Sequence, residues 1–155
     1  MLKSVADEPD VFVEIAGMGK VVRNGPPLKW DGSYAELMQA AVFCFVPAGD
    51  TPTSRRLFDA MISGCLPVVI SDHIGKHLPF SSVIPYYDFM FKVQEKTWIA
   101  DPKAVLQRFR AISAEHIEQR RAIMANYAPC IDWLAGENVL SLIMQEALQG
   151  LQQRF

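Results

Sequence analysis

Two short apolar runs flank an amphipathic segment in the middle of the chain. Residues 42–46 (VFCFV) and 66–71 (LPVVIS) are almost entirely apolar, which is typical of strands buried on both faces. Between them, residues 54–63 place their apolar side chains on one face of a helix, and Gly64 supplies a common helix end. This order predicts a βαβ unit with parallel strands and a right-handed crossover. The predicted fold class is therefore α/β.

Further periodic segments lie on both sides of this unit. Ser33 fits a helix N-cap, and Pro102 fits the first turn of another helix. The elements that we expect are a strand at 11–15, a helix at 34–41, a third strand-like run at 89–93, a helical stretch that begins at Pro102 and is broken at Pro129, and a last helix at 137–148. We therefore expect one domain over residues 1–155, with helices filling residues 101–155.

The composition is that of a globular domain. The chain has 155 residues, of which 50% are hydrophobic and 21% are charged, and its formal net charge is −2. These values support a packed core and exclude an intrinsically disordered chain. They also disfavour a nucleic-acid partner, so phosphate binding would have to come from a local site. No apolar run approaches the ~18 residues of a membrane span, and the charged first ten residues differ from a signal peptide, so we expect neither a signal nor a membrane anchor in this chain.

The chain has three cysteines, Cys44, Cys65 and Cys130, with no metal-ligand spacing. The interpretation that we favour from the sequence is that they are small buried hydrophobic residues. The alternative is one structural disulfide with a thiol left over, if the protein matures in an oxidising compartment. Their spacing does not decide between the two.

A polar segment, GDTPTSRRLFDA (residues 49–60), follows the first buried strand. In a parallel sheet, ligands bind beyond the carboxyl ends of the strands, where helix N-termini offer unpaired N–H groups. Arg55 and Arg56 lie in the first helical turn, where the helix dipole disfavours cations. A bound diphosphate would explain them, because guanidinium and backbone N–H groups can share its oxygens. Asp59, one turn further on the same face, is placed to accept hydrogen bonds from the hydroxyls of a ribose.

A simpler interpretation of these residues is a surface ion pair. Arg55 and Asp59 have i,i+4 spacing, which stabilises a helix by about 0.2 to 0.5 kcal/mol, with Arg56 merely solvated. The favourable order of such a pair places the acid nearer the helix N-terminus, and this sequence has the reverse order. The residues alone therefore favour a phosphate site and leave the ion pair open.

Few other residues in the sequence indicate chemistry. Asp72 and His73 follow the second buried strand and are candidates for lining a cleft, the alternative being a turn-forming Asp beside a solvated His. The sequence has no Asp-x-Asp motif and no His cluster, so we expect no metal. It also lacks the G-x-G-x-x-G turn of a dehydrogenase-like dinucleotide domain. The catalytic residues remain unassigned.

The string FCFVPAGDTPTSRRLFDAMISGCLPVVISD (residues 43–72), followed by LPF, resembles the exostosin-like glycosyltransferases of the GT47 type. This family contains heparan-sulfate polymerising enzymes and plant cell-wall galactosyl-, arabinosyl- and xylosyltransferases. The resemblance extends in weaker form over residues 34–93. Its pieces GDTPTSRRLFDA and SGCLPV are together far more specific than a lone glycine motif.

The resemblance implies a GT-B arrangement of two facing Rossmann-like halves, whose C-terminal half holds the nucleotide-sugar donor. This chain looks like that C-terminal half, a Rossmann-like parallel sheet with flanking helices, and we expect the N-terminal half to be absent from it. In the implied site, the loop from Gly49 to Ser54 faces the phosphates, the arginines approach the diphosphate and the acid binds the ribose. The implied donor-binding residues are Gly49, Asp50, Thr51, Ser54, Arg55, Arg56 and Asp59.

The activity implied by the resemblance is transfer of a sugar from a nucleotide-sugar, most simply a UDP-sugar, to a glycan acceptor in the Golgi, with no tightly bound cofactor. The acceptor would bind through the N-terminal half, so we do not expect turnover by this chain alone, and we expect it to associate with itself or with a partner. One departure is Ala48, where the family often has a basic residue before the glycine. The alternative is a non-catalytic fragment or pseudo-enzyme that acts as a binding or interaction module.

Overall fold

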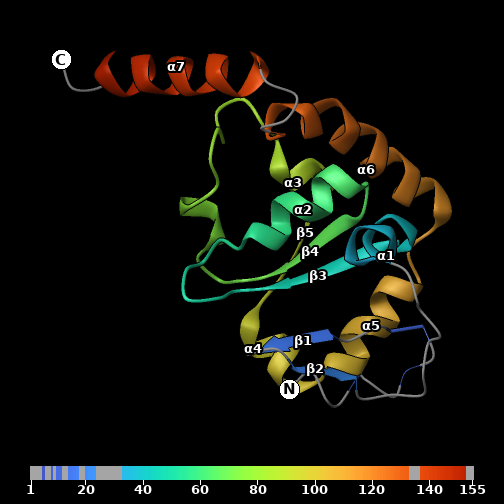
Figure 1. Ribbon diagram of the computed structural model, residues 1–155. Coiled ribbons are helices and arrows are strands. Elements are labelled where there is room, and N and C mark those ends of the chain that lie inside the picture. Colours follow the sequence, from blue (N-terminus) through green and yellow to red (C-terminus); the bar gives the residue numbers. More distant parts are fainter. Residues whose placement is uncertain are drawn as a thin grey trace.

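The computed structural model contains a three-stranded parallel sheet (Figure 1). The structure describes residues 5, 8, 10, 11, 14–17, 20–23, 33–132 and 137–152. The strands of the sheet, in spatial order, are β3 (Phe43–Pro47), β4 (Leu66–Ile70) and β5 (Phe91–Val93). Helix α2 (Arg55–Ser63) connects β3 to β4, which pair in parallel with Phe43 opposite Leu66. The predicted α/β class, a Rossmann-like parallel sheet with flanking helices, is confirmed.

Helices make up most of the rest of the described chain. They are α1 (Tyr34–Ala40), α3 (Tyr86–Phe89), α4 (Glu95–Ala100), α5 (Pro102–Arg110), α6 (Ala114–Tyr127) and α7 (Glu137–Gln152), with short 3-10 turns η2 (Ile74–Lys76) and η3 (Ala128–Cys130). Within the described residues, none of these helices is long and apolar enough to cross a membrane.

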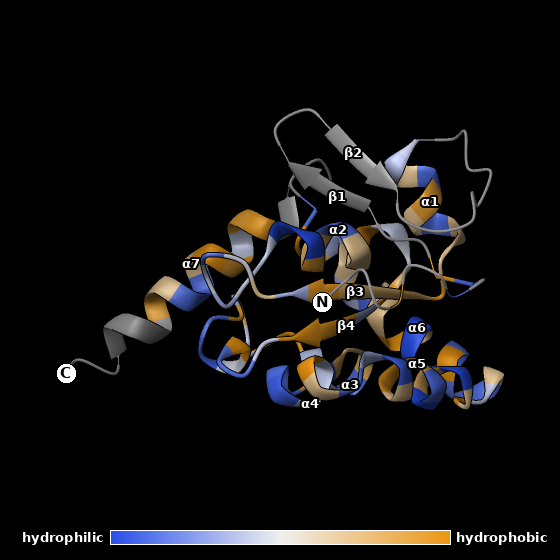
Figure 2. Cartoon of the chain, turned by 90° about the horizontal axis from the view of Figure 1, so that it is seen from below, coloured by the Kyte–Doolittle hydropathy of each residue, from blue (hydrophilic) through white to orange (hydrophobic). Residues whose placement is uncertain are grey.

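The central strand β4 is buried at all five positions, and from Val68 to Ile70 its side chains alternate between two cores. Val69 packs in the first core with residues of α2, α3 and α6. Val68 and Ile70 pack in the second core with residues of α4 and α5. In Figure 2, most of β3 and β4 has the colour of hydrophobic residues. A strand covered on both faces needs apolar residues at every position, which explains the continuous run LPVVI.

The elements before the sheet form a small hairpin and a capped helix. Strands β1 (Glu14–Gly17) and β2 (Lys20–Arg23) pair in an antiparallel manner, with Glu14 opposite Arg23. Of the strand expected at 11–15, residues 14 and 15 belong to β1, which continues to Gly17, whereas residue 11 is not in a strand. Residues 12 and 13 lie outside the described residues. Helix α1 begins as expected: the Ser33 side chain accepts a hydrogen bond from Glu36 N at 3.3 Å, and the Glu36 carboxylate accepts one from Ser33 N at 2.6 Å.

Two expectations downstream of the sheet centre are wrong in their boundaries. The strand-like run 89–93 begins inside α3, so that Phe89 is helical and only residues 91–93 belong to the strand. The helical stretch from Pro102 ends at Arg110 and restarts at Ala114, because the side chain of Ser113 accepts a hydrogen bond from His116 N and caps α6. Apolar residues continue at helical spacing from α5 into α6. In the sequence, only the capping residue Ser113 indicates the break between them. Helix α4 was not anticipated, and α7 extends beyond its expected end.

Helix α5 holds an N-terminal segment through ion pairs. Arg110 Nε donates to Asp10 Oδ2 at 2.8 Å, and Glu8 contacts both Arg110 and Lys103 at 3.1 Å. Hydrogen bonds from Lys103 and Arg110 hold the pKa of Glu8 below its ordinary value of 4.5, and Arg110 holds that of Asp10 below 3.8. The nearby Val5 is buried in the second core, so this segment completes the layer that covers α5.

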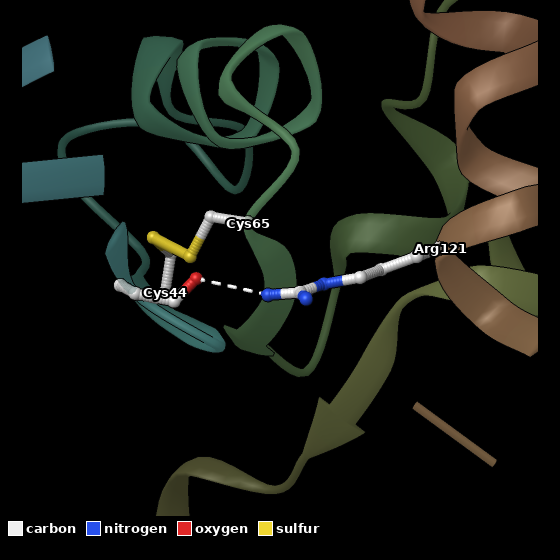
Figure 3. Close-up of a disulfide and its surroundings, with 4 residues drawn as sticks. Cys44, Cys65 and Arg121 are labelled. Carbon is white, nitrogen blue, oxygen red and sulfur yellow. Dashed lines mark hydrogen bonds between the residues drawn. A yellow bond between two sulfur atoms is a disulfide. The ribbon is translucent and has the colours of Figure 1, made fainter. Parts of the chain in front are cut away.

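A disulfide joins Cys44 of β3 to Cys65, the residue before β4, with a Cα–Cα distance of 5.8 Å (Figure 3). The favoured expectation of three reduced cysteines is therefore wrong, and the alternative of one disulfide with Cys130 left over is what the structure contains. The register of parallel strands brings the two residues together, and this register is not visible in their spacing. Beside the disulfide, Arg121 Nη2 of α6 donates to the carbonyl of Ala41 at 3.2 Å.

We expect loss of the disulfide to destabilise the domain. Closing a loop with a sequence separation of 21 restricts the unfolded chain, which corresponds to about 3 kcal/mol at 25 °C in the chain-entropy model. The double variant Cys44→Ser/Cys65→Ser should lose about this amount in urea unfolding, whereas Cys130→Ser should unfold like the parent chain. Equal stability of the double variant and the parent would contradict the assignment of the disulfide as a stabilising link.

We also expect the α5 ion pairs to weaken in acid. Because the folded-state pKa values of Glu8 and Asp10 are lowered, their contribution is present above the ordinary values and is lost as pH falls through the lowered ones. Arg110→Ala should therefore be less stable than the parent near neutral pH, and the difference should vanish on acidification. Arg108→Ala, which removes an exposed arginine of the same helix, serves as the control in thermal unfolding across this pH range. If the stability difference between Arg110→Ala and the parent does not change with pH, the ion pairs of Arg110 with Glu8 and Asp10 are not its cause.

Candidate donor-binding site

The candidate site lies at the carboxyl edge of the sheet, where β3 leads into α2. The ladder between β3 and β4 continues one residue further, since Ala48 N donates to Ile70 O at 2.9 Å. The loop then turns: Gly49 N donates to Thr51 O at 3.2 Å, and Thr51 Oγ1 donates to Thr53 O at 2.7 Å. These bonds hold the predicted loop at the edge where parallel sheets bind ligands.

Helix α2 begins and ends where its sequence predicts. The Ser54 side chain accepts a hydrogen bond from Arg56 N at 3.4 Å as the N-cap, and Gly64 ends the helix in the left-handed conformation with φ of 79°. Leu57, Ala60 and Met61 are buried. The burial of this face leaves the opposite, polar face outward at the sheet edge.

The polar face of α2 carries the two arginines and the acid. Arg55 Nε lies 3.5 Å from Asp59 Oδ1, with the Arg55 side chain 90% exposed and that of Asp59 31% exposed. Arg56 is exposed and makes no side-chain hydrogen bond or ion pair with the described residues. The surface ion pair that the sequence left open is therefore formed. Such an exposed pair contributes little to stability, so Arg55 can exchange Asp59 for another anion at small cost.

The loop that precedes α2 is open to solvent. Gly49, Asp50 and Thr51 are exposed. A Cβ built on Gly49 would meet no atom within 4 Å, and the backbone of Gly49 lies outside the left-handed region. The fold itself therefore does not need glycine at this position. A glycine in open space lets a ligand approach the backbone closely.

Asp72 and His73 follow β4 at the same edge and differ in their contacts. The Asp72 carboxylate accepts a hydrogen bond from Glu95 N at 3.2 Å, and Asp72 N donates to Glu95 Oε1 at 3.0 Å. Lys92 Nζ donates to Asp72 O at 2.8 Å. Asp72 thus caps α4, whose N-cap residue Gln94 makes no side-chain cap bond. The exposed His73 makes no such contact.

The structure therefore brings the predicted residues to one edge, and it adds Lys92 and Glu95 to them. Sequence reasoning missed both, because each lies at least 20 residues from Asp72 and neither belongs to a motif. Within the described residues, no three His, Cys, Asp or Glu side chains gather in a way that could hold a metal.

Two hollows lie away from the candidate site. One of about 520 Å³ lies between the C-terminal end of α2 and α6, and one of about 510 Å³ lies between α4 and α5. Neither is lined by the loop 48–54 or by the arginines of α2. Because residues 49–51 and both arginines are exposed, the candidate site is an open edge, which fits a ligand that is enclosed by a second surface.

The same residues fall within a match to a known family. The family model described as the Exostosin GT47 domain matches residues 10–109, a range that includes the loop, α2 and Asp72. The chain belongs to this GT47 family. The match covers the parallel sheet and stops before α6, so the family relationship lies in the part of the chain that carries the candidate site.

Curated GT47 relatives are named as glycosyltransferases of different specificity. The probable arabinosyltransferase ARAD1 of Arabidopsis thaliana is 35% identical over 96 residues, which cover 62% of this chain and 21% of that protein. The probable beta-1,4-xylosyltransferase IRX10L of the same plant is 39% identical over 94 residues, 61% of this chain and 21% of that protein. A probable glucuronosyltransferase of rice, Os04g0398600, is 47% identical over 64 residues, 41% of this chain and 15% of that protein. The chain thus spans about a fifth or less of their length.

The contacts of Asp72 predict that its replacement destabilises the fold, whereas replacement of His73 should not. Asp72→Ala removes the acceptor from the first turn of α4 and should lower the free energy of unfolding by about 1 kcal/mol, the usual cost of a lost cap. Asp72→Asn keeps an acceptor oxygen and should lose less. His73→Ala should stay within about 0.5 kcal/mol of the parent in urea unfolding. If Asp72→Ala is as stable as His73→Ala, the capping role is wrong.

Proposed function

We propose that this chain supplies the donor-binding part of a GT-B glycosyltransferase and holds a nucleotide-sugar, with a UDP-sugar as the donor. The loop 48–54 and the first turn of α2 would receive the diphosphate. A glycosyl group would pass from this donor to a hydroxyl of a glycan acceptor. Membership of the GT47 family supports the class of reaction, and the geometry at the edge of the sheet supports the donor role.

The observation that carries the proposal is the pair of arginines in the first turn of α2. The first turn contains no acid, and both guanidinium groups are exposed at the start of the helix, where Arg56 N has only the Ser54 side chain as partner, at 3.4 Å. Two cations at a helix N-terminus are unfavourable unless an anion joins them. A diphosphate can pair with both arginines at once at the positive end of the helix, because each phosphate has several acceptor oxygens.

The remaining residues fit the other parts of a nucleotide. Asp59 lies one turn beyond Arg55 and is placed for the ribose hydroxyls once Arg55 turns to the phosphates. The open space above Gly49 admits a close approach of the ligand to the backbone. In the transfer step, the bond between the sugar and the diphosphate breaks, and the arginines would stabilise the negative charge that develops on the departing diphosphate.

The second surface that encloses the donor would come from a facing half of the GT-B arrangement, which would also bind the acceptor. The exposure of the loop 49–51 and of both arginines supports this division of the site. The named activities of the relatives make arabinose, xylose and glucuronic acid the first sugars to test. The Cys44–Cys65 disulfide supports maturation in an oxidising compartment, in agreement with a secretory or Golgi location.

The test is nucleotide binding by variants of the polar face of α2, measured by titration calorimetry at low salt. Arg56→Ala should weaken UDP by about 1.5 to 3 kcal/mol and leave uridine unchanged, because its partner is a phosphate. Asp59→Asn should weaken both UDP and uridine, because its partner is the ribose. NAD should not bind.

Two controls separate these roles from general charge effects. Arg108→Ala removes an exposed arginine on α5, remote from the edge, and should bind UDP like the parent. Arg55→Ala breaks the ion pair with Asp59, so a loss seen only with UDP in both Arg55→Ala and Asp59→Asn would mean that Asp59 acts through Arg55. The absence of UDP binding by the folded parent, or equal binding by Arg56→Ala and the parent, would overturn the donor site.

A further inference from the structure

Ser71 is a polar residue among buried apolar ones. It follows the last residue of β4 directly and is 1% exposed. Within the described residues, Ser71 Oγ makes no hydrogen bond. One other buried side-chain atom there lacks a partner, Arg121 Nε, but the two remaining nitrogens of that guanidinium group are bonded to Glu118 and Ala41. A buried hydroxyl without a partner destabilises a fold, so its presence at Ser71 requires an explanation.

The end of β4 places Ser71 below the start of α2. Side chains alternate between the two faces of an extended chain, and Ile70 packs in the second core whereas Val69 packs in the first. Ser71 therefore lies on the face of Val69, which α2 covers. Helix α2 begins at the edge where β3 ends and runs back toward the start of β4 (Figure 1). Its first turn, with Arg55 and Arg56, thus lies over the end of the strand at which Ser71 stands.

The neighbours of Ser71 on both sides of the strand have no group to offer its hydroxyl. Pro47 pairs with Ile70, and Ala48 N donates to Ile70 O at 2.9 Å, so that Ala48 lies beside Ser71 at the start of the loop 48–54. The side chain of Ala48 has no polar atom. The carboxylate of Asp72, the next residue, accepts its hydrogen bond from Glu95 N instead. The partner of the Ser71 hydroxyl is therefore to be sought in a ligand at this edge.

The surroundings of Ser71 select an anion that accepts hydrogen bonds. A serine hydroxyl can donate one hydrogen bond, and phosphate oxygens accept them. The positive end of α2 and the exposed Arg55 and Arg56 favour negative charge at the same place. A bound water would satisfy the hydroxyl but would leave the two arginines without an anion.

We propose that Ser71 Oγ donates a hydrogen bond to a phosphate oxygen of the bound nucleotide-sugar, on the inner side of a site whose outer side is formed by Arg55 and Arg56. This inference rests on the proposed donor function and adds a residue to it. Because the hydroxyl is covered in the free chain, the loop 49–53 must shift when the donor binds. The hydrogen bonds of this loop within the described residues join Gly49 to Thr51 and Thr51 to Thr53, so a shift breaks none to the rest of the fold.

The test compares nucleotide binding with stability in variants of Ser71. By titration calorimetry, Ser71→Ala should weaken UDP about tenfold or more and leave uridine unchanged, because a hydrogen bond to a charged phosphate is lost. In urea unfolding, the same variant should be as stable as the parent or more stable, because it removes a buried hydroxyl that has no partner in the free chain. Ser71→Gly, which also lacks the hydroxyl, should lose UDP affinity to the same extent, whatever its stability.

The control variant is Ser63→Ala, which removes a hydroxyl from the opposite end of α2 and should bind UDP like the parent. If the parent binds UDP and Arg56→Ala weakens it while Ser71→Ala does not, the role of Ser71 is wrong and the donor site stands. A Ser71→Ala variant that loses stability and keeps its UDP affinity would assign the hydroxyl to a structural water instead. An equal loss of uridine and UDP would exclude a phosphate as the partner. A folded parent that binds no UDP would overturn the donor site and this inference together.

Discussion

The complete burial of β4 is the constraint on which the rest of the structure depends. A parallel strand in the middle of a sheet has both faces covered, and it cannot pair with a sequential neighbour through a short turn. The chain must therefore cross over through α2 and must supply α4 and α5 for the other face. The same topology places the carboxyl ends of β3, β4 and β5 at one edge. The loop after β3 and the helix α2 that it enters carry the residues that the proposed function assigns to the donor site.

The two sides of that edge are held by different means. On the β3 side, the cap of Ser54 and the buried side of α2 orient Arg55 and Arg56, whose side chains stay exposed. On the β4 side, Asp72 and Glu95 exchange two hydrogen bonds and fix the start of α4. The arginines are thus exposed and available to a ligand, whereas Asp72 is already bonded within the fold. Exposed positive charge lies where a diphosphate would bind.

Local sequence signals predicted the part of the fold that local interactions determine. The unit from β3 to β4 was predicted because its apolar runs, its N-cap and Gly64 lie within about 30 residues of one another and agree. The break between α5 and α6 was missed because apolar spacing continues through Ser113. The disulfide and the contact between Asp72 and Glu95 depend on strand register, which a pattern along one strand does not reveal. The residues of the candidate site were located in sequence, but their partners came from the fold.

The disulfide between Cys44 and Cys65 closes a covalent ring that contains the whole loop 48–54 and all of α2. The exposed loop is the part of this ring that a protease reaches most easily. A single cut there would open the ring without releasing a fragment, because the two new ends remain joined through the sulfur atoms. The arginines on one side of the cut and the end of β3 on the other would stay on one molecule. The disulfide would thereby keep the two parts of the candidate site on one molecule after such a cut.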